Sequence, residues 1–266
     1  CSWRVSKKII IYQCTIGFLE LMITFNQHIS HMTNSTFNSV KAIALIFFSA
    51  LGCTDHSNNL AKSDTSTPQI KDTKVFKILI LGDSLTEGYG VQESEAYPTL
   101  LEKRLNLEIS PHTAMPYSVI NGGITGSTSS GGVSRIQWFL QCKPDLLLLA
   151  LGGNDGLRGV PVKETRQNLR TILEKAQEHS ITAVLAGMKI PPNYGPVYSK
   201  EFAEIFPSLA DSLDIPLIPF LLEGVGGNPK FNLPDRIHPN PAGHKIISDL
   251  VFRHLSEELL PLTPSP

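Results

Sequence analysis

Five short apolar runs recur between residues 74 and 260, and each has the length of one β-strand. The run "DLLLLAL" is apolar throughout, which is typical of a strand covered on both faces. Hydrophobic residues between the runs recur at i, i+3, i+4 and i+7, the spacing of one helix face. The strand-like runs cover 75–81, 117–120, 145–151, 182–187 and 215–220. The helical sets are Leu169, Ile172, Leu173 and Ala176; Phe202, Phe206, Leu209 and Leu213; Ile246, Ile247, Leu250 and Val251; and a weaker set of Tyr97, Leu100, Leu101 and Leu105.

Strand and helix patterns therefore alternate along this part of the chain, with no internal sequence repeat. Alternation of this kind predicts βαβ units and an α/β fold, a three-layer sandwich in which helices cover both faces of a five-stranded parallel sheet. Ligands bind beyond the carboxyl ends of the strands in such sheets. The residues that follow each strand are therefore the candidates for function.

The segments outside this domain differ from it in composition. We expect residues 1–53 to be an upstream extension with an export signal, 54–73 a polar flexible linker, 74–260 the folded domain and 261–266 a tail. Met32 is a candidate start. From there Lys41 precedes an apolar run over 42–51, which is the layout of a secretory signal and is too short to span a bilayer.

The end of that run, "SALGC", resembles a bacterial lipoprotein signal, in which Cys53 would carry the lipid. Ala50 stands where such signals usually have leucine, and cleavage elsewhere is the alternative reading. This part of the sequence predicts an exported bacterial protein, either periplasmic or anchored to a membrane through Cys53.

Charge and composition narrow the range of functions. The net charge is −1 and 18% of the residues are charged, so the chain lacks the basic footprint of a nucleic-acid-binding protein. Neither GxxxxGK[ST] nor GxGxxG follows a predicted strand, which argues against a nucleotide- or flavin-binding protein. No CxxC pair occurs, and His238 and His244 lack a third partner at metal-ligand spacing. We expect no metal and no cofactor.

Polar and glycine residues follow every predicted strand. "GDSLT" follows the first, "NGGITGSTSSGG" the second, "GGNDGLRG" the third and "MKIPPNYG" the fourth, while "DRIHPN" comes between the fifth strand and the last helix. Because parallel strands end at one edge of the sheet, these segments should converge there. That convergence is stronger evidence for a site than any one motif.

Ser84 in "GDSLT" is either a helix cap or a nucleophile, and a serine hydroxyl becomes a good nucleophile only beside a base. His238 is the candidate base, because Asn240 and Pro241 look like the cap and first residue of the last helix and place it in the preceding loop. Asp235, three residues earlier, could bond one ring nitrogen and leave the other facing Ser84. The alternative is two polar residues in a surface loop.

Donors for a developing negative charge are also present. The side chain of Asn154 could donate to an oxyanion, and Asp155 could anchor its loop by accepting backbone N–H groups, although Asn-Asp-Gly is also an ordinary turn. A glycine of "NGGITGST" could present a bare backbone N–H, and Gly122, Gly123 and Gly126 all remain open for that role.

With these blocks in this order, residues 75–257 resemble the SGNH (GDSL) hydrolases, and within them the bacterial arylesterase, acyl-CoA thioesterase I and lysophospholipase L1 group. The blocks are "GDSLT", "GGNDGLRG" and "DRIHPN", and "PPNYG" before a helix also fits that group. The resemblance implies a flavodoxin-like sheet and a catalytic set of Ser84, Asp235 and His238. It also implies an oxyanion hole made by Ser84, Asn154 and, by alignment of the second block, Gly126.

The resemblance implies a serine esterase that acts on short- to medium-chain acyl or aryl esters, acyl thioesters or lysophospholipids through an acyl-serine intermediate. A carbohydrate acetyl-esterase and a ligand-binding surface lipoprotein are the alternatives. From their places in the loops, we expect Ile124, Leu157, Pro192 and Tyr194 to bind the substrate. The substrate would be a small molecule or a lipid, with no nucleic-acid partner, and the oligomeric state stays open.

Overall fold

Residues 74–259 are described by the computed structural model. The predicted signal segment, Cys53, the linker and the tail lie outside the described residues. The helices and strands, in chain order, are β1 (Phe76–Gly82), α2 (Ser84–Glu87), η1 (Glu93–Glu95), α3 (Tyr97–Glu108), α4 (Ser110–Thr113), β2 (Tyr117–Gly123), α5 (Ser129–Leu140), β3 (Leu146–Ala150), α6 (Gly153–Leu157), α7 (Val162–Glu178), β4 (Thr182–Ala186), η2 (Pro192–Tyr194), α8 (Pro196–Leu213), β5 (Leu217–Ile218) and α9 (Pro241–Leu259).

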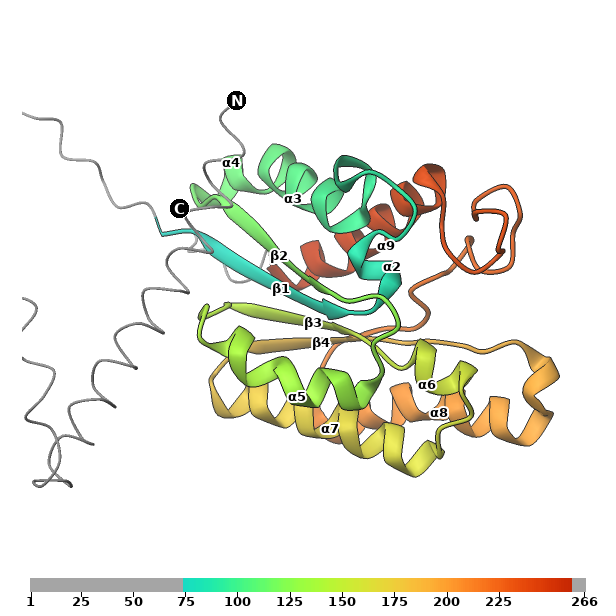
Figure 1. The fold of residues 1–266 in the computed structure, drawn as a ribbon. Coiled ribbons are helices and arrows are strands. Elements are labelled where there is room, and N and C mark those ends of the chain that lie inside the picture. The colour runs from blue at the N-terminus through green and yellow to red at the C-terminus, as the bar shows by residue number, and fades with distance from the viewer. Residues whose placement is uncertain (1–73, 260–266) are drawn as a thin grey trace, which may run out of the picture. The chain divides into compact units, whose positions relative to one another are not determined.

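The five strands pair in parallel in the order β2-β1-β3-β4-β5, which is the flavodoxin-like order. Helices α3 and α9 cover one face of the sheet, and α5, α7 and α8 cover the other (Figure 1). The predicted three-layer α/β sandwich is confirmed. The short helices α2 and α6 lie at the edge where the strands end (Figure 1). The residues that follow β1 and β3 therefore lie at the same edge of the sheet.

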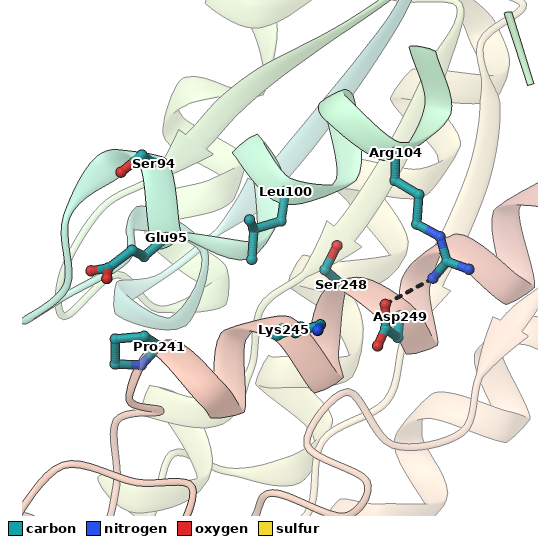
Figure 2. Close-up of a pocket in the computed structure, with 8 residues that line it drawn as sticks. All are labelled: Ser94, Glu95, Leu100, Arg104, Pro241, Lys245, Ser248 and Asp249. Atoms are coloured by element: carbon teal, nitrogen blue, oxygen red, sulfur yellow. Dashed lines mark hydrogen bonds and ion pairs between the residues drawn. The ribbon is translucent and has the colours of Figure 1, made fainter. Parts of the chain in front are cut away.

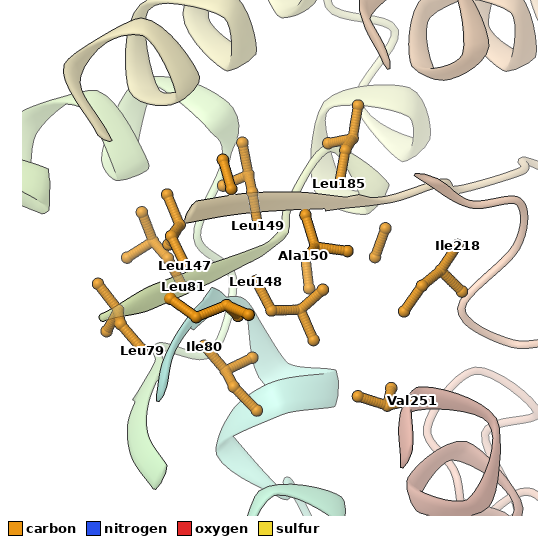
Figure 3. Close-up of a cluster of buried hydrophobic side chains, with 14 of the residues drawn as sticks. Leu79, Ile80, Leu81, Leu147, Leu148, Leu149, Ala150, Leu185, Ile218 and Val251 are labelled. Carbon is orange, nitrogen blue, oxygen red and sulfur yellow. The ribbon is translucent and has the colours of Figure 1, made fainter. Parts of the chain in front are cut away.

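The core is built on the two central strands. Side chains of β1 and β3 alternate across the sheet, so Ile80 and Leu148 point toward Val251 of α9 while Leu147 and Leu149 point to the opposite side (Figure 3). All five of these side chains are fully buried. Burying a leucine or isoleucine contributes about 1.5–3 kcal/mol each, so these strands anchor both layers of helices.

Several element boundaries differ from the prediction. Strand β2 runs three residues beyond 117–120, because Asn121 to Gly123 continue the ladder beside β1. Strand β5 has two residues rather than six, since only Leu217 and Ile218 pair with β4. The sequence patterns located these strands but not their ends, which depend on the neighbouring strand.

Helix α5 was not predicted at all. Its sequence opens "SSGGV", and glycines weaken a helical pattern. A side chain at Gly132 would put Cβ 2.5 Å from Leu151 Cδ1 and 2.8 Å from Ile172 Cδ1, so glycine is what lets α5 approach α7 and the residue that follows β3. Thr128 caps the helix by accepting from the Gly131 N–H at 3.5 Å.

His244 of α9 is fully buried, although a histidine on a helix of mixed polarity would be expected to be partly solvated. Its Nδ1 accepts the Tyr97 N–H at 3.3 Å, and within residues 74–259 its Nε2 has no hydrogen-bond partner. Burial lowers the pKa of His244 from 6.5 to about 4, with Glu95 opposing the shift and His238 adding to it.

We expect this histidine to make the fold acid-sensitive. The unfolded chain takes up the proton near pH 6.5 and the folded chain only near pH 4, so stability is complete above pH 6.5 and falls as the pH drops toward 4. The loss from this group should reach about 3 kcal/mol in the free energy of unfolding. Denaturant unfolding at pH 7.5, 6, 5 and 4 measures it.

His244→Asn keeps an acceptor for the Tyr97 N–H and removes the titration, so its unfolding free energy should vary less with pH. His254→Asn, on the same helix but partly exposed, is the matched control and should keep the wild-type pH dependence. An equal loss in His244→Asn and wild type between pH 6.5 and 4 would contradict the assignment.

Candidate active site

Ser84 lies at the first position of α2, directly beyond the carboxyl end of β1. Asp83 caps this helix, because its Oδ1 accepts the Leu85 N–H at 3.0 Å. The Ser84 side chain is held at the sheet edge, and the Ser84 residue is 7% exposed. Within residues 74–259 its backbone N–H has no acceptor, as expected for the first turn of a helix.

The structure brings Ser84, His238 and Asp235 into one hydrogen-bonded chain. The Nε2 of His238 is 3.0 Å from the Oγ of Ser84, and its Nδ1 is 2.7 Å from the Oδ2 of Asp235. Ser84 and His238 are 154 positions apart in the sequence. As predicted, α9 begins at Pro241, and the Asn240 Oδ1 caps it by accepting the Gly243 N–H at 3.1 Å.

The ionisation state of Asp235 determines which ring nitrogen of His238 carries a hydrogen. Burial acts to raise the pKa of Asp235, but hydrogen bonds from the His238 N–H, the His238 ring and the Ile237 N–H outweigh it and lower the pKa to about 2. The carboxylate is therefore ionised at neutral pH and can only accept. His238 Nδ1 must then carry the hydrogen, which leaves Nε2 free to accept the proton of the Ser84 hydroxyl.

Asn154 lies in α6, beyond the end of β3, and faces the turn that carries Ser84. Its Nδ2 donates to the Asp83 Oδ2 at 3.3 Å and to the Ser127 carbonyl at 3.0 Å. Burial raises the pKa of Asp83 to about 6, although the Leu85 N–H bond opposes the shift. Asp83 thus joins the helix cap of α2 to the amide of Asn154, a link that the sequence analysis missed.

Asp155 of α6 accepts a backbone N–H as expected, but from Ser129 at the start of α5, after β2, and not from its own loop. Asp155 is 1% exposed, and its carboxylate accepts the Ser129 N–H at 2.8 Å and the Ser129 hydroxyl at 2.5 Å. The Nδ2 of Asn168 in α7 donates to the same hydroxyl at 3.0 Å. The loop that follows β2 is therefore tied to α6 and α7 at the start of α5.

Of the three candidate glycines, Gly126 has an amide open to an added acceptor. Within residues 74–259 its N–H makes no hydrogen bond, whereas the Gly123 N–H donates to the Asn121 Oδ1 at 2.9 Å. Gly122 lies buried within β2, paired in register with Leu81 of β1.

Two charged side chains hold the loop around Gly126. The Arg158 guanidinium donates to the Gly126 carbonyl at 3.0 Å. The Glu87 Oε2 accepts the Thr125 N–H at 2.6 Å and the Thr125 hydroxyl. The sequence offered no signal for either contact, since each joins separate loops.

The predicted substrate-binding residues are exposed around this edge. Ile124 follows β2 and is 52% exposed, Leu157 ends α6 and is 36% exposed, and Tyr194 ends η2 and is 38% exposed. Pro192 begins η2, and its side chain is not among those described. Their contact with a substrate stays a prediction.

A separate pocket of about 300 Å³ lies between α3 and α9 (Figure 2). Arg104 and Asp249 line it and form an ion pair at 2.8 Å, and Glu95 and Lys245 also line it. None of the predicted site residues lines this pocket, so it is distinct from the edge that carries Ser84.

Residues 74–259 hold no group of three His, Cys, Asp or Glu side chains placed to ligate a metal ion. No helix in that range combines the length and the hydropathy needed to cross a membrane.

Known proteins are similar to this chain in sequence and in fold. Residues 80–246 match the family model of the GDSL-like Lipase/Acylhydrolase family. The chain is 38% identical to an arylesterase of Vibrio mimicus over 184 residues, which covers 69% of this chain and 90% of that protein. It is also 38% identical to thioesterase 1/protease 1/lysophospholipase L1 of Escherichia coli K12 over 179 residues, 67% of this chain and 82% of that protein.

A crystal structure of the psychrotrophic esterase EstA from Pseudoalteromonas sp., inhibited by monoethylphosphonate, matches with a TM-score of 0.65 and 34% identity. The match covers 69% of this chain and 98% of that one. The residues matched by the family model, 80–246, include Ser84, Asn154 and His238. The chain belongs to the GDSL-like lipase/acylhydrolase family.

Proposed function

We propose that this protein is a carboxylic ester hydrolase that works through an acyl-serine intermediate. The observation that carries the proposal is the hydrogen-bonded chain from Asp235 through His238 to the Ser84 hydroxyl, with contacts of 2.7 and 3.0 Å. A hydroxyl paired with a neutral imidazole, itself oriented by a carboxylate, is the arrangement that activates serine for acyl transfer.

In the first half-reaction, Ser84 Oγ attacks the carbonyl carbon and His238 Nε2 takes the hydroxyl proton. The C–O or C–S bond to the leaving group then breaks, and the imidazolium gives its proton to the departing alcohol or thiol. In the second half-reaction, His238 takes a proton from water, the hydroxide attacks the acyl-serine, and Ser84 leaves with the proton returned to it.

Three donors are proposed for the negative oxygen that forms in each half-reaction: the N–H groups of Ser84 and Gly126 and the side-chain amide of Asn154. The free N–H groups of Ser84 and Gly126 support their part. The Asn154 contact with Asp83, at 3.3 Å, is the longer of its two bonds, and a charged oxygen would compete for that hydrogen.

The substrates are proposed from the named relatives, an arylesterase and a thioesterase and lysophospholipase. We propose aryl esters and short- to medium-chain acyl esters first, with acyl thioesters and lysophospholipids as further substrates. The exposed apolar side chains of Ile124 and Leu157 near the site support an acyl group over a strongly polar one.

The test is hydrolysis of p-nitrophenyl esters from acetate to palmitate, combined with labelling by a p-nitrophenyl phosphonate. We expect turnover of the shorter esters, and one phosphonyl group on the peptide that contains Ser84. Ser130→Ala, which alters an exposed serine of α5, is the matched control and should hydrolyse and label as wild type does. No turnover of any ester in the series, or a label on another residue, would overturn the proposal.

A further inference from the structure

Tyr89 lies against the face of the histidine in the proposed catalytic chain. The ring centroids of Tyr89 and His238 are 4.4 Å apart, with 40° between the ring planes. Tyr89 is 48% exposed, so core packing does not account for its position. In the sequence Tyr89 stands between two glycines just after "GDSLTE", and no motif there indicates a role for it.

The backbone fixes this ring between the nucleophile and the histidine loop. Gly88 and Gly90 have φ of +88° and +77°, in the left-handed region, and the Tyr89 N–H donates to the Ser84 carbonyl at 3.1 Å. At Gly90 a Cβ would meet the Leu233 side chain at 2.5 Å. The Leu233 N–H in turn donates to the His238 carbonyl at 2.7 Å. The segment that carries Tyr89 is thus packed against the loop that carries His238.

During ester hydrolysis the His238 ring changes from neutral to positively charged. The face of an aromatic ring carries a negative potential and attracts a cation in contact with it. We propose that Tyr89 is a positioning residue that holds the His238 imidazole over Ser84 and stabilises its protonated form. This inference rests on the proposed function, since it concerns the proton that His238 takes from Ser84.

Three other titratable groups act on the same imidazole. Asp235, in the same loop, accepts a hydrogen bond from the His238 Nδ1. Asp83, in the turn before α2, and His244, in α9, interact with the imidazole electrostatically. None of these groups is changed by a substitution at Tyr89, so a difference between Tyr89 variants reports the ring itself.

Tyr89→Leu removes the aromatic face and keeps an apolar side chain, while Tyr89→Phe keeps the ring and removes the hydroxyl. We expect Tyr89→Leu to lower kcat on p-nitrophenyl butyrate by about two- to fivefold, with KM nearly unchanged. The acid limb of its kcat/KM profile should move to lower pH by about 0.4–0.7 unit, because the imidazolium loses its partner.

Tyr89→Phe should behave as wild type in both measurements. Trp138→Leu, which removes an exposed aromatic ring on α5, is the matched control and should also leave kcat and the acid limb unchanged. The proposal is overturned if Tyr89→Leu keeps the wild-type profile, or if Tyr89→Phe loses as much as Tyr89→Leu.

A second measurement separates this inference from the proposed function. The NMR signal of the His238 ring is followed against pH in Ser84→Ala and in Ser84→Ala/Tyr89→Leu, where no turnover is needed. The same displacement to lower pH in the double variant supports the ring contact, and its absence overturns it. Failure of wild type to hydrolyse any ester would instead overturn the proposed function.

Discussion

Ser84→Ala is expected to lower kcat/KM on p-nitrophenyl butyrate by at least about 10⁴-fold. The alanine cannot form the acyl-enzyme, and what remains is the activity that binding and oxyanion stabilisation give to attack by water. The fold should survive, because the Ser84 hydroxyl bonds only to His238 among the described residues and the Asp83 cap of α2 stays in place. Initial rates corrected for buffer hydrolysis measure the effect.

The double variant makes this prediction sharper. Ser84 and His238 act as one unit in the proposed mechanism, so Ser84→Ala/His238→Ala should be little slower than Ser84→Ala alone. If the two residues contributed independently, the rate loss of the double variant would be the product of the two single losses. Ser130→Ala serves again as the control, and a Ser84→Ala enzyme within tenfold of wild type would rule out Ser84 as the nucleophile.

Asn154→Ala is expected to lower kcat by about 10²–10³-fold, the usual cost of losing one oxyanion donor. The charge on the carbonyl oxygen is largest in the transition state, so KM should stay within about twofold of wild type. Steady-state kinetics on two esters of different leaving group separate the two constants. A loss of less than tenfold would contradict the role of Asn154.

A structural explanation for that loss can be tested in the same protein. Asn154 also donates to Asp83 and Ser127, so Asn154→Ala should lower the free energy of unfolding by about 1 kcal/mol. Asn154→Leu is the matched variant, because it keeps the approximate size of the side chain and removes the amide donor without placing a second carboxylate beside Asp83. Both variants should remain folded and slow, whereas recovery of kcat in Asn154→Leu would show that size rather than donation matters.

The sequence predicts the layers of this fold well because its strands are short, apolar and regularly spaced. Because parallel strands all end at one edge of the sheet, the sequence also predicts that the segments carrying Ser84, Asn154 and His238 meet. It cannot predict contacts that depend on loop paths, such as the Asn154 amide at Asp83 or the Tyr89 ring on His238. Those contacts join segments whose relative positions are fixed only once the sheet has formed.

Other features stayed hidden because local sequence preference and tertiary packing disagree. Helix α5 contains Gly131 and Gly132, which weaken a helical pattern, but Gly132 permits close approach to Leu151, just after β3, and to α7. His244 looks like a surface residue in a mixed helix, yet Tyr97 and the α3 layer enclose it. Residues of this kind are understood only from the elements that pack against them.

The separation of 154 positions between Ser84 and His238 has a consequence for how the enzyme regains function after denaturation. The serine follows the first strand of the sheet and the histidine precedes the last helix, so the two meet only when the beginning and the end of the domain are packed together. Recovered turnover in a refolding experiment therefore reports that these two segments have docked. A molecule in which they are apart has no means of cleaving an ester by this route.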